Sequence, residues 1–149
     1  PPETLGQGLE LSAEEEFALI HYNYETVSQF LEKMNRYTNA QAEELKKEGY
    51  EFDWKDIFEK PLGEFLSRFF AREGYKDGLH GLALAFLQAF SFMVVYLKLW
   101  EMEKFKEQGI NLMELGNQKD KSGQEIDYWM KKSRQRGNFF ERIFKKDKN

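Results

Sequence analysis

The chain has 149 residues, of which 41% are hydrophobic and 24 are aromatic, and this is enough to build one domain with an apolar core. It contains no cysteine, which excludes disulfide bonds, thiolate catalysis and cysteine-ligated metal sites. The formal net charge is −4, but residues 129–149 carry eight Lys or Arg and two acidic residues, so this tail is +6 and the remainder is −10.

The first 24 residues allow three local structures. They begin PPETLGQG, without an initiator Met or a signal-peptide pattern, so we expect the chain to start inside a longer protein. Residues 17–24, FALIHYNY, have the composition of a β-strand, but no partner strand follows. Ser12 and Glu15 form a capping-box pattern that predicts a helix over residues 13–20 instead. An irregular arm is the third alternative.

Helical periodicity begins at residue 25. Apolar residues recur every three or four positions, at Val27, Phe30, Leu31, Met34 and Tyr37. Thr38 and Gln41 form a second capping box. This pattern predicts a separate helix from residue 40 to residue 48, ended by Gly49.

The next predicted helix begins at Pro61, whose missing N–H suits a first turn, and ends at Gly74 as a left-handed cap residue. One apolar stripe runs along it, made of Leu62, Phe65, Leu66, Phe69 and Phe70. The stripe predicts a helix that lies on an apolar surface.

A long apolar helix is predicted from Leu79 to about Glu107, after a turn at residues 75–78. Its first part, up to Leu97, is nearly hydrophobic all round and approaches the roughly 20 residues that span a bilayer. Gln88 lies at its centre and charged residues follow Leu97 directly. We therefore favour burial in a helical core or a subunit interface over a membrane span.

Residues 109–123 are predicted to be a polar hinge, and a third capping box, Ser122 with Glu125, predicts the start of a final helix. The basic tail is interleaved with phenylalanines, which suits an anionic membrane surface; a solvated C-terminus is the alternative. Nucleic acid is not expected as a partner, because the body of the chain is acidic. The predicted fold class is all-α, an irregular bundle of five or six helices with a short N-terminal strand or arm.

The inventory of catalytic groups is small. The two histidines, His21 and His80, lie on different predicted elements without metal-ligand spacing, and no phosphate-binding glycine loop or GxSxG motif is present. Runs of carboxylates such as residues 14–16 are interpreted as solvated helix faces. We predict no catalytic residue, no metal site and no cofactor within this chain.

A resemblance adds to this interpretation. Residues 60–101 read KPLGEFLSRFFAREGYKDGLHGLALAFLQAFSFMVVYLKLWE, and this run resembles the C-terminal region of bacterial family 2 glycosyltransferases of the lipopolysaccharide-core type. The matching residues are Lys60, Pro61, Phe65, Gly74, Tyr75, Asp77, Gly78, Gly81, Tyr96, Lys98 and Glu101. Upstream, IHYNYETVSQFLEKMNRYTNAQAEEL looks like the segment that leaves the nucleotide-sugar domain, and both matches lie within residues 20–101.

The resemblance implies a GT-A catalytic domain on the N-terminal side, with a DxD-type motif for Mg²⁺ or Mn²⁺ and a carboxylate base, none of which this chain contains. Residues 1–24 would then be an arm from that domain, 25–108 a helical C-terminal domain, and 109–149 a hinge, final helix and basic tail. It also implies that His21 can reach the metal-bound diphosphate of the donor; packing against neighbouring tyrosines is the alternative.

The expected function is that of a helical region of a glycosyltransferase that transfers a sugar from a nucleotide-sugar donor to a cell-envelope or lipid-linked acceptor. Such an enzyme would be cytoplasmic and peripheral to the inner membrane. The residues expected to meet a membrane or a protein interface are Phe65, Phe69, Phe70, Phe86, Phe90 and Val94, and those expected to meet phosphates are Arg68, Arg72 and Lys76. The alternative is a non-enzymatic interaction module, and under either hypothesis we expect a homo-oligomer.

Overall fold

A computed structural model of the chain describes residues 26–146, with side-chain surroundings for residues 26–136. This part is mainly helical and contains no strand, which confirms the all-α class in its coarse form. The α-helices are α1 (Val27–Lys47), α2 (Asp56–Leu66), α3 (Gly78–Met102) and α4 (Leu112–Lys146), and a π-helical turn, η2 (Ser67–Ala71), and a 3-10 turn, η3 (Gly74–Asp77), join α2 to α3. The expected five or six helices are thus four within these residues. His21 and the alternatives for residues 13–24 lie outside the described residues.

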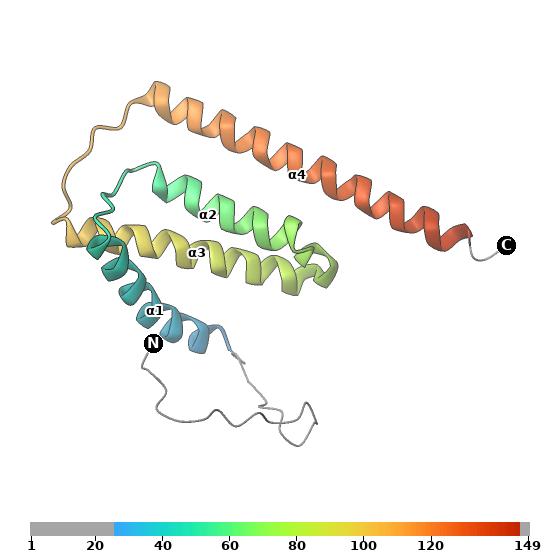
Figure 1. The fold of residues 1–149 in the computed structure, drawn as a ribbon, viewed down its shortest axis with the longest axis horizontal. Helices are drawn as coiled ribbons and strands as arrows, with labels where there is room; N and C mark the ends of the chain where they lie inside the picture. The colour runs from blue at the N-terminus through green and yellow to red at the C-terminus, as the bar shows by residue number, and fades with distance from the viewer. Residues whose placement is uncertain (1–25, 147–149) are drawn as a thin grey trace, which may run out of the picture.

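The helices form a hairpin with a helix on either side. Figure 1 shows α2 and α3 side by side, α1 crossing the end of α3 where that helix finishes, and α4 running along α2 and beyond it. The core lies where α1, α3 and the α1–α2 connection meet. Its buried members are Ala42, Phe52, Val95, Tyr96 and Leu99. The other end of the hairpin, at η2 and η3, lies outside this cluster.

The first helix, α1, is continuous, so the predicted break at Thr38 is wrong. The Thr38 side chain is fully buried, and its hydroxyl donates to the Met34 carbonyl oxygen at 2.8 Å. A threonine hydroxyl can bond to the carbonyl one turn earlier in a helix as well as cap a helix start. The true cap is Thr26, which accepts the Gln29 N–H at 3.2 Å. Gly49, with φ of 80°, follows the helix end as predicted.

The second helix starts before Pro61, and this corrects the predicted boundary. The Asp56 carboxylate accepts the Asp53 N–H at 3.1 Å and the Tyr50 hydroxyl at 2.9 Å, which fixes the connection at the first turn of α2. Pro61 lies inside α2, where it removes one backbone donor. The helix then widens into the π-helical turn η2, closed by the Arg72 N–H to the Ser67 carbonyl oxygen at 2.8 Å.

The tip of the hairpin depends on two glycines for space. The left-handed residue is Glu73, with φ of 62°, and Gly74 does not have the predicted left-handed conformation. A Cβ atom at Gly74 would lie 2.9 Å from the Arg68 carbonyl oxygen, and one at Gly81 would lie 1.9 Å from the Gly74 carbonyl oxygen. The chain can therefore reverse direction here because both residues lack a side chain.

The boundaries of the last two helices also differ from the prediction. The third helix, α3, ends at Met102, before the predicted Glu107, because Lys104 and Phe105 both have positive φ. The fourth helix, α4, starts at Leu112, so the hinge predicted over residues 109–123 is mostly helix and the start at Ser122 is wrong. The Asn111 side chain accepts the Met113 N–H at 2.8 Å, which serves the first turn of α4.

Candidate functional site

The most unusual surface of the protein is the apolar helix α3. The segment Gly74–Met102 is long and apolar enough to cross a membrane, yet only 28% of its apolar 18-residue stretch is buried within the protein. Leu79 is 81% exposed, Phe86 58% and Phe90 42%. The helix is therefore buried, as predicted, only on the side that faces α1 and α2. The rest of the helix presents a contiguous apolar face, which in soluble proteins marks an interaction surface.

An apolar groove of about 450 Å³ is lined by the two helices of the hairpin and by one residue of α4. Its walls are Pro61, Leu62 and Phe65 from α2 and Phe86, Ala89, Phe90 and Met93 from α3, and Ile126 of α4 lies over it. The Phe65 and Phe86 rings are 4.7 Å apart between centroids, so they pack against each other across the hairpin. Among the described residues, no charged side chain lines the groove.

The structure brings most of the predicted interface residues together. Phe65 contacts Phe69, Phe70 and Phe86 with ring centroids 4.7–6.3 Å apart, in one aromatic cluster that continues into Tyr75. Phe90 lies one helical turn from Phe86 on α3 and lines the same groove. Val94 is half-buried on α3, and it does not line the groove.

The three cations predicted to meet phosphates lie at or near the tip, in different surroundings. Arg68 forms an ion pair with Glu64 one turn earlier, and Lys76 pairs with Glu73 at 2.5 Å. The hydrogen bond from Lys76 holds the pKa of the Glu73 carboxyl below its ordinary value. Arg72 is exposed at the end of η2.

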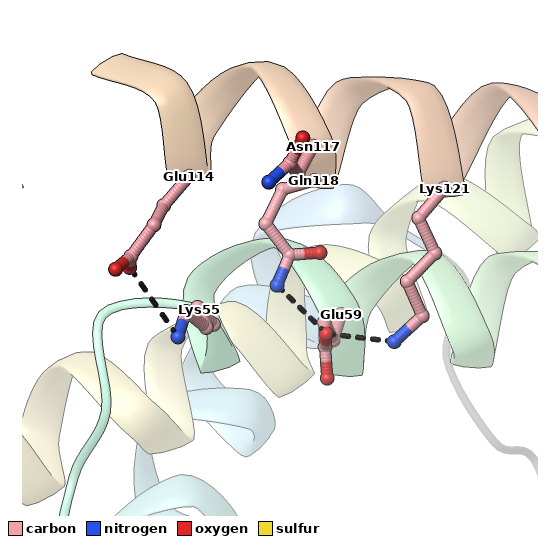
Figure 2. Close-up of a pocket in the computed structure, with 6 residues that line it drawn as sticks. All are labelled: Lys55, Glu59, Glu114, Asn117, Gln118 and Lys121. Atoms are coloured by element: carbon pink, nitrogen blue, oxygen red, sulfur yellow. Dashed lines mark hydrogen bonds and ion pairs between the residues drawn. The ribbon is translucent and has the colours of Figure 1, made fainter. Parts of the chain in front are cut away.

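The sequence analysis missed a polar contact that holds α4 against α2, here called the Glu59 clasp. In Figure 2 one Glu59 carboxylate oxygen accepts from the Gln118 amide at 2.8 Å and from the Lys121 ammonium at 2.9 Å. Lys55 and Glu114 add an ion pair at 3.5 Å. The spacing of Glu114, Gln118 and Lys121 is helical and would have indicated one face, but these residues were assigned to a hinge.

Electrostatics strengthen the Glu59 clasp, and a cavity adjoins it. The hydrogen bond from Lys121, followed by that from Gln118, lowers the pKa of Glu59, and the same ion pair raises the pKa of Lys121. Gln118 is only 8% exposed, and its carbonyl oxygen has no partner within the described residues. The clasp residues line an open polar hollow of about 350 Å³. Its charges are largely paired with each other, so we assign this hollow a structural role.

A partly buried polar cluster around Lys60 joins α2 to α3 near the core. The Lys60 ammonium lies 5.5 Å and 5.6 Å from the ring centroids of Tyr50 and Tyr96, and 3.8 Å from the Asp56 carboxylate. Burial, followed by the hydrogen bond to Asp56, raises the pKa of Tyr50 far above its ordinary value. The phenol therefore stays protonated and acts as a donor. The structural role of these four residues in joining α2 to α3 explains why they are polar.

Several of the residues that carry the family resemblance take such structural roles. Gly81 allows the close approach at the tip, and Lys60 and Tyr96 belong to the partly buried polar cluster. Lys98 donates to the Asn35 carbonyl oxygen and to the Thr38 hydroxyl at 2.8 and 2.9 Å, which joins α3 to α1. These residues thus help to build the hairpin.

Comparison with protein families, with curated proteins and with solved structures finds no match to this chain. The resemblance to family 2 glycosyltransferases therefore depends on the residues quoted for it. Within the described residues no group of three or more His, Asp or Glu side chains is placed to hold a metal ion. The strongest functional feature of this part of the chain is the apolar surface of the hairpin.

Proposed function

We propose that this chain is a helical module that holds the catalytic domain of a family 2 glycosyltransferase at an anionic membrane surface. The observation that carries the proposal is the exposure of the apolar helix α3. Only 28% of its apolar 18-residue stretch is buried within the protein. Exposed aromatic and aliphatic side chains on such a helix gain free energy by entering the boundary between lipid headgroups and acyl chains.

The distribution of basic residues also supports binding to an anionic membrane. The basic segment 131–136 on α4 lies at the same end of the hairpin as Lys76, because the charge of Arg136 acts on both Lys76 and Glu73. A surface that combines exposed phenylalanines with nearby cations suits a leaflet with anionic headgroups. Holding an enzyme at this surface removes most of the search for an amphiphilic acceptor.

The enzymatic part of the proposal rests on the resemblance. The complete protein would transfer a sugar from a nucleotide-sugar donor to a cell-envelope or lipid-linked acceptor on the cytoplasmic side of the inner membrane. Mg²⁺ or Mn²⁺ would be bound by its catalytic domain. Sequencing the reading frame upstream of Pro1 tests this directly: a βα domain with a DxD motif supports the assignment, and any other domain type overturns it.

The membrane part is tested by sedimentation with vesicles of phosphatidylcholine alone and with added phosphatidylglycerol. We expect binding that increases with the anionic lipid, and we expect Phe86→Asp to reduce it because a charge would enter the exposed apolar face. Tyr37→Asp is a matched control, since Tyr37 is 66% exposed on α1. Absence of binding to both kinds of vesicle would refute membrane attachment.

A non-enzymatic role in self-association is the second candidate, favoured by the same exposed α3 face. Light scattering at several protein concentrations separates it from membrane attachment. Under the oligomer hypothesis Phe86→Asp yields a monomer without lipid present, while Tyr37→Asp leaves the mass unchanged.

A further inference from the structure

We infer that the groove under Ile126 binds one hydrocarbon chain of an anionic amphiphile, with the headgroup held by the cations toward the tip of the hairpin. The inference deepens the proposed membrane function, because it names a lipid as a bound ligand rather than as a surface. Nothing in this inference requires the catalytic domain.

The residues that line the groove indicate that its ligand is a hydrocarbon. All eight lining residues are apolar, and the volume of about 450 Å³ falls in the range of roughly 300–1,000 Å³ typical of small-molecule sites. A ligand with hydrogen-bonding groups would lose its water there without gaining a partner, which costs free energy. A hydrocarbon chain loses no hydrogen bond to water there and buries its own apolar surface.

Ile126 of α4 adds a third wall to the groove. The Glu59 clasp fixes α4 beside the start of α2, and Ile126 follows two turns later over the groove. On the opposite side Ala89 is almost fully buried and its small side chain forms the floor. An occupant thus has walls from three helices, as a bound acyl chain requires.

Charge complementarity decides the headgroup. At the clasp end of the groove Lys121 is neutralised by Glu59 and Lys60 by Asp56. At the tip end the stretch 128–136 of α4 has four cations and no acidic residue. The field therefore favours an anion at the tip end of the groove.

The test uses a fluorescent fatty acid, cis-parinaric acid, below its micelle concentration and without vesicles. We expect saturable binding by the unmodified chain, and binding weakened by about tenfold or more in Ala89→Trp, which fills the floor. Ala83→Trp is the matched control, because Ala83 is exposed on the same helix and does not line this groove. Circular dichroism confirms that both variants keep their helices.

A second variant guards against misfolding at Ala89. Ile126→Glu places a carboxylate over the groove from the surface of α4, and we expect it to weaken binding of the fatty acid. The corresponding fatty alcohol measures the headgroup contribution. Replacing Lys132 and Arg136 with Gln should weaken binding of the acid and leave binding of the alcohol unchanged.

Three results would overturn the inference. The first is an absence of saturable fatty-acid binding, and the second is equal binding by Ala89→Trp and the unmodified chain. The third is a concentration-dependent dimer that Ala89→Trp abolishes, because the groove would then be occupied by a second copy. If the chain sediments with vesicles but does not bind the monomeric acid, only the groove is refuted; if it does neither, the proposed function is refuted as well.

Discussion

At the scale of single residues, Gly81 shows how a missing side chain sets the fold. We expect Gly81→Ala to destabilise the protein by about 1–3 kcal/mol, because the new methyl group would overlap the Gly74 carbonyl oxygen and force the tip apart. Gly63→Ala is the control: among the described residues nothing lies within 4 Å of the place its methyl group would take, and alanine favours the helix by about 0.5–1 kcal/mol. Urea unfolding of both variants measures the difference. A Gly81→Ala variant as stable as the parent would contradict the tip geometry.

Lys98 is the main polar connection between α3 and α1. Its ammonium donates to acceptors on Asn35, Thr38 and Asn39, and burial lowers its pKa while Glu101 counteracts this. We expect Lys98→Met to lower the free energy of unfolding by about 1–3 kcal/mol, because charged hydrogen bonds are lost and their acceptors are left unpaired.

The control for Lys98 is Lys47→Met, which removes the same charge from an exposed position at the end of α1. Thermal unfolding followed by circular dichroism compares the two. Equal stability of the two variants would mean that the Lys98 contacts contribute no more than an exposed charge.

The sequence predicted which residues form the apolar faces of the helices better than it predicted where the helices begin and end. The apolar positions of α2 and α3 were found because apolar residues recur in the sequence with the spacing of a helix. Thr38 and Ser122 were misread as caps, since the same side chain that caps a helix start also fits inside one. Glu73 could not be found as the left-handed residue, because Gly74 beside it satisfies the same local rule.

At the scale of elements, the attachment of α4 depends on pH through Glu59. Its pKa is lowered in the folded protein, so its contribution is complete above the ordinary Glu range and is lost as pH falls through the lowered pKa. The pKa of Lys121 is raised, so its contribution is lost only as pH rises through that raised value. We therefore expect α4 to detach in acid, as pH falls below the ordinary Glu range and through the lowered pKa of Glu59, with the rest of the hairpin still helical.

The absence of native cysteine makes this measurable. Spin labels at Gly63→Cys on α2 and Lys119→Cys on α4 report the distance between the helices as pH is lowered. Glu59→Gln removes the titrating group, and we expect the distance to change little with acid in that variant. A pH profile identical with and without Glu59 would show that another group controls α4.

Sequence reasoning could predict the two helices of the hairpin and the turn between them, but not the docking of α4 against them. A continuous apolar run defines α3 and its neighbour, whereas the docking of α4 depends on the pairing of Glu59 with Gln118 and Lys121 across about 60 residues of chain. Such polar pairs leave no periodic signal, because each member alone is compatible with a solvated face. The groove was missed for the same reason: its residues were recognised separately, but its cover comes from a helix whose first turns were predicted to be a hinge.

At the scale of the whole molecule, the charge is divided along the chain. Residues 129–149 carry +6 and the remainder carries −10, so an anionic surface attracts the part of the chain to which α4 belongs. The attraction favours an orientation in which the tip of the hairpin faces the lipid. This orientation also brings the exposed Leu79 at the start of α3 toward the membrane.

We expect a fourfold replacement by Gln to weaken binding to phosphatidylglycerol vesicles by up to about 4 kcal/mol, since each basic residue near the surface contributes about 1 kcal/mol. The replaced residues are Lys131, Lys132, Arg134 and Arg136. Binding of the unmodified chain should also fall as salt is added, because exposed charges are screened over about 8–10 Å at physiological ionic strength. Sedimentation across a salt series measures both effects.

The control changes the net charge equally at other places. It replaces four exposed lysines by Gln, namely Lys47, Lys104, Lys106 and Lys119. If position matters, this control binds anionic vesicles as well as the parent or slightly less, because two of its sites lie in the α3–α4 connection at the core end. Equal losses in the two fourfold variants would mean that net charge alone governs attraction, and the tip-first orientation would be wrong.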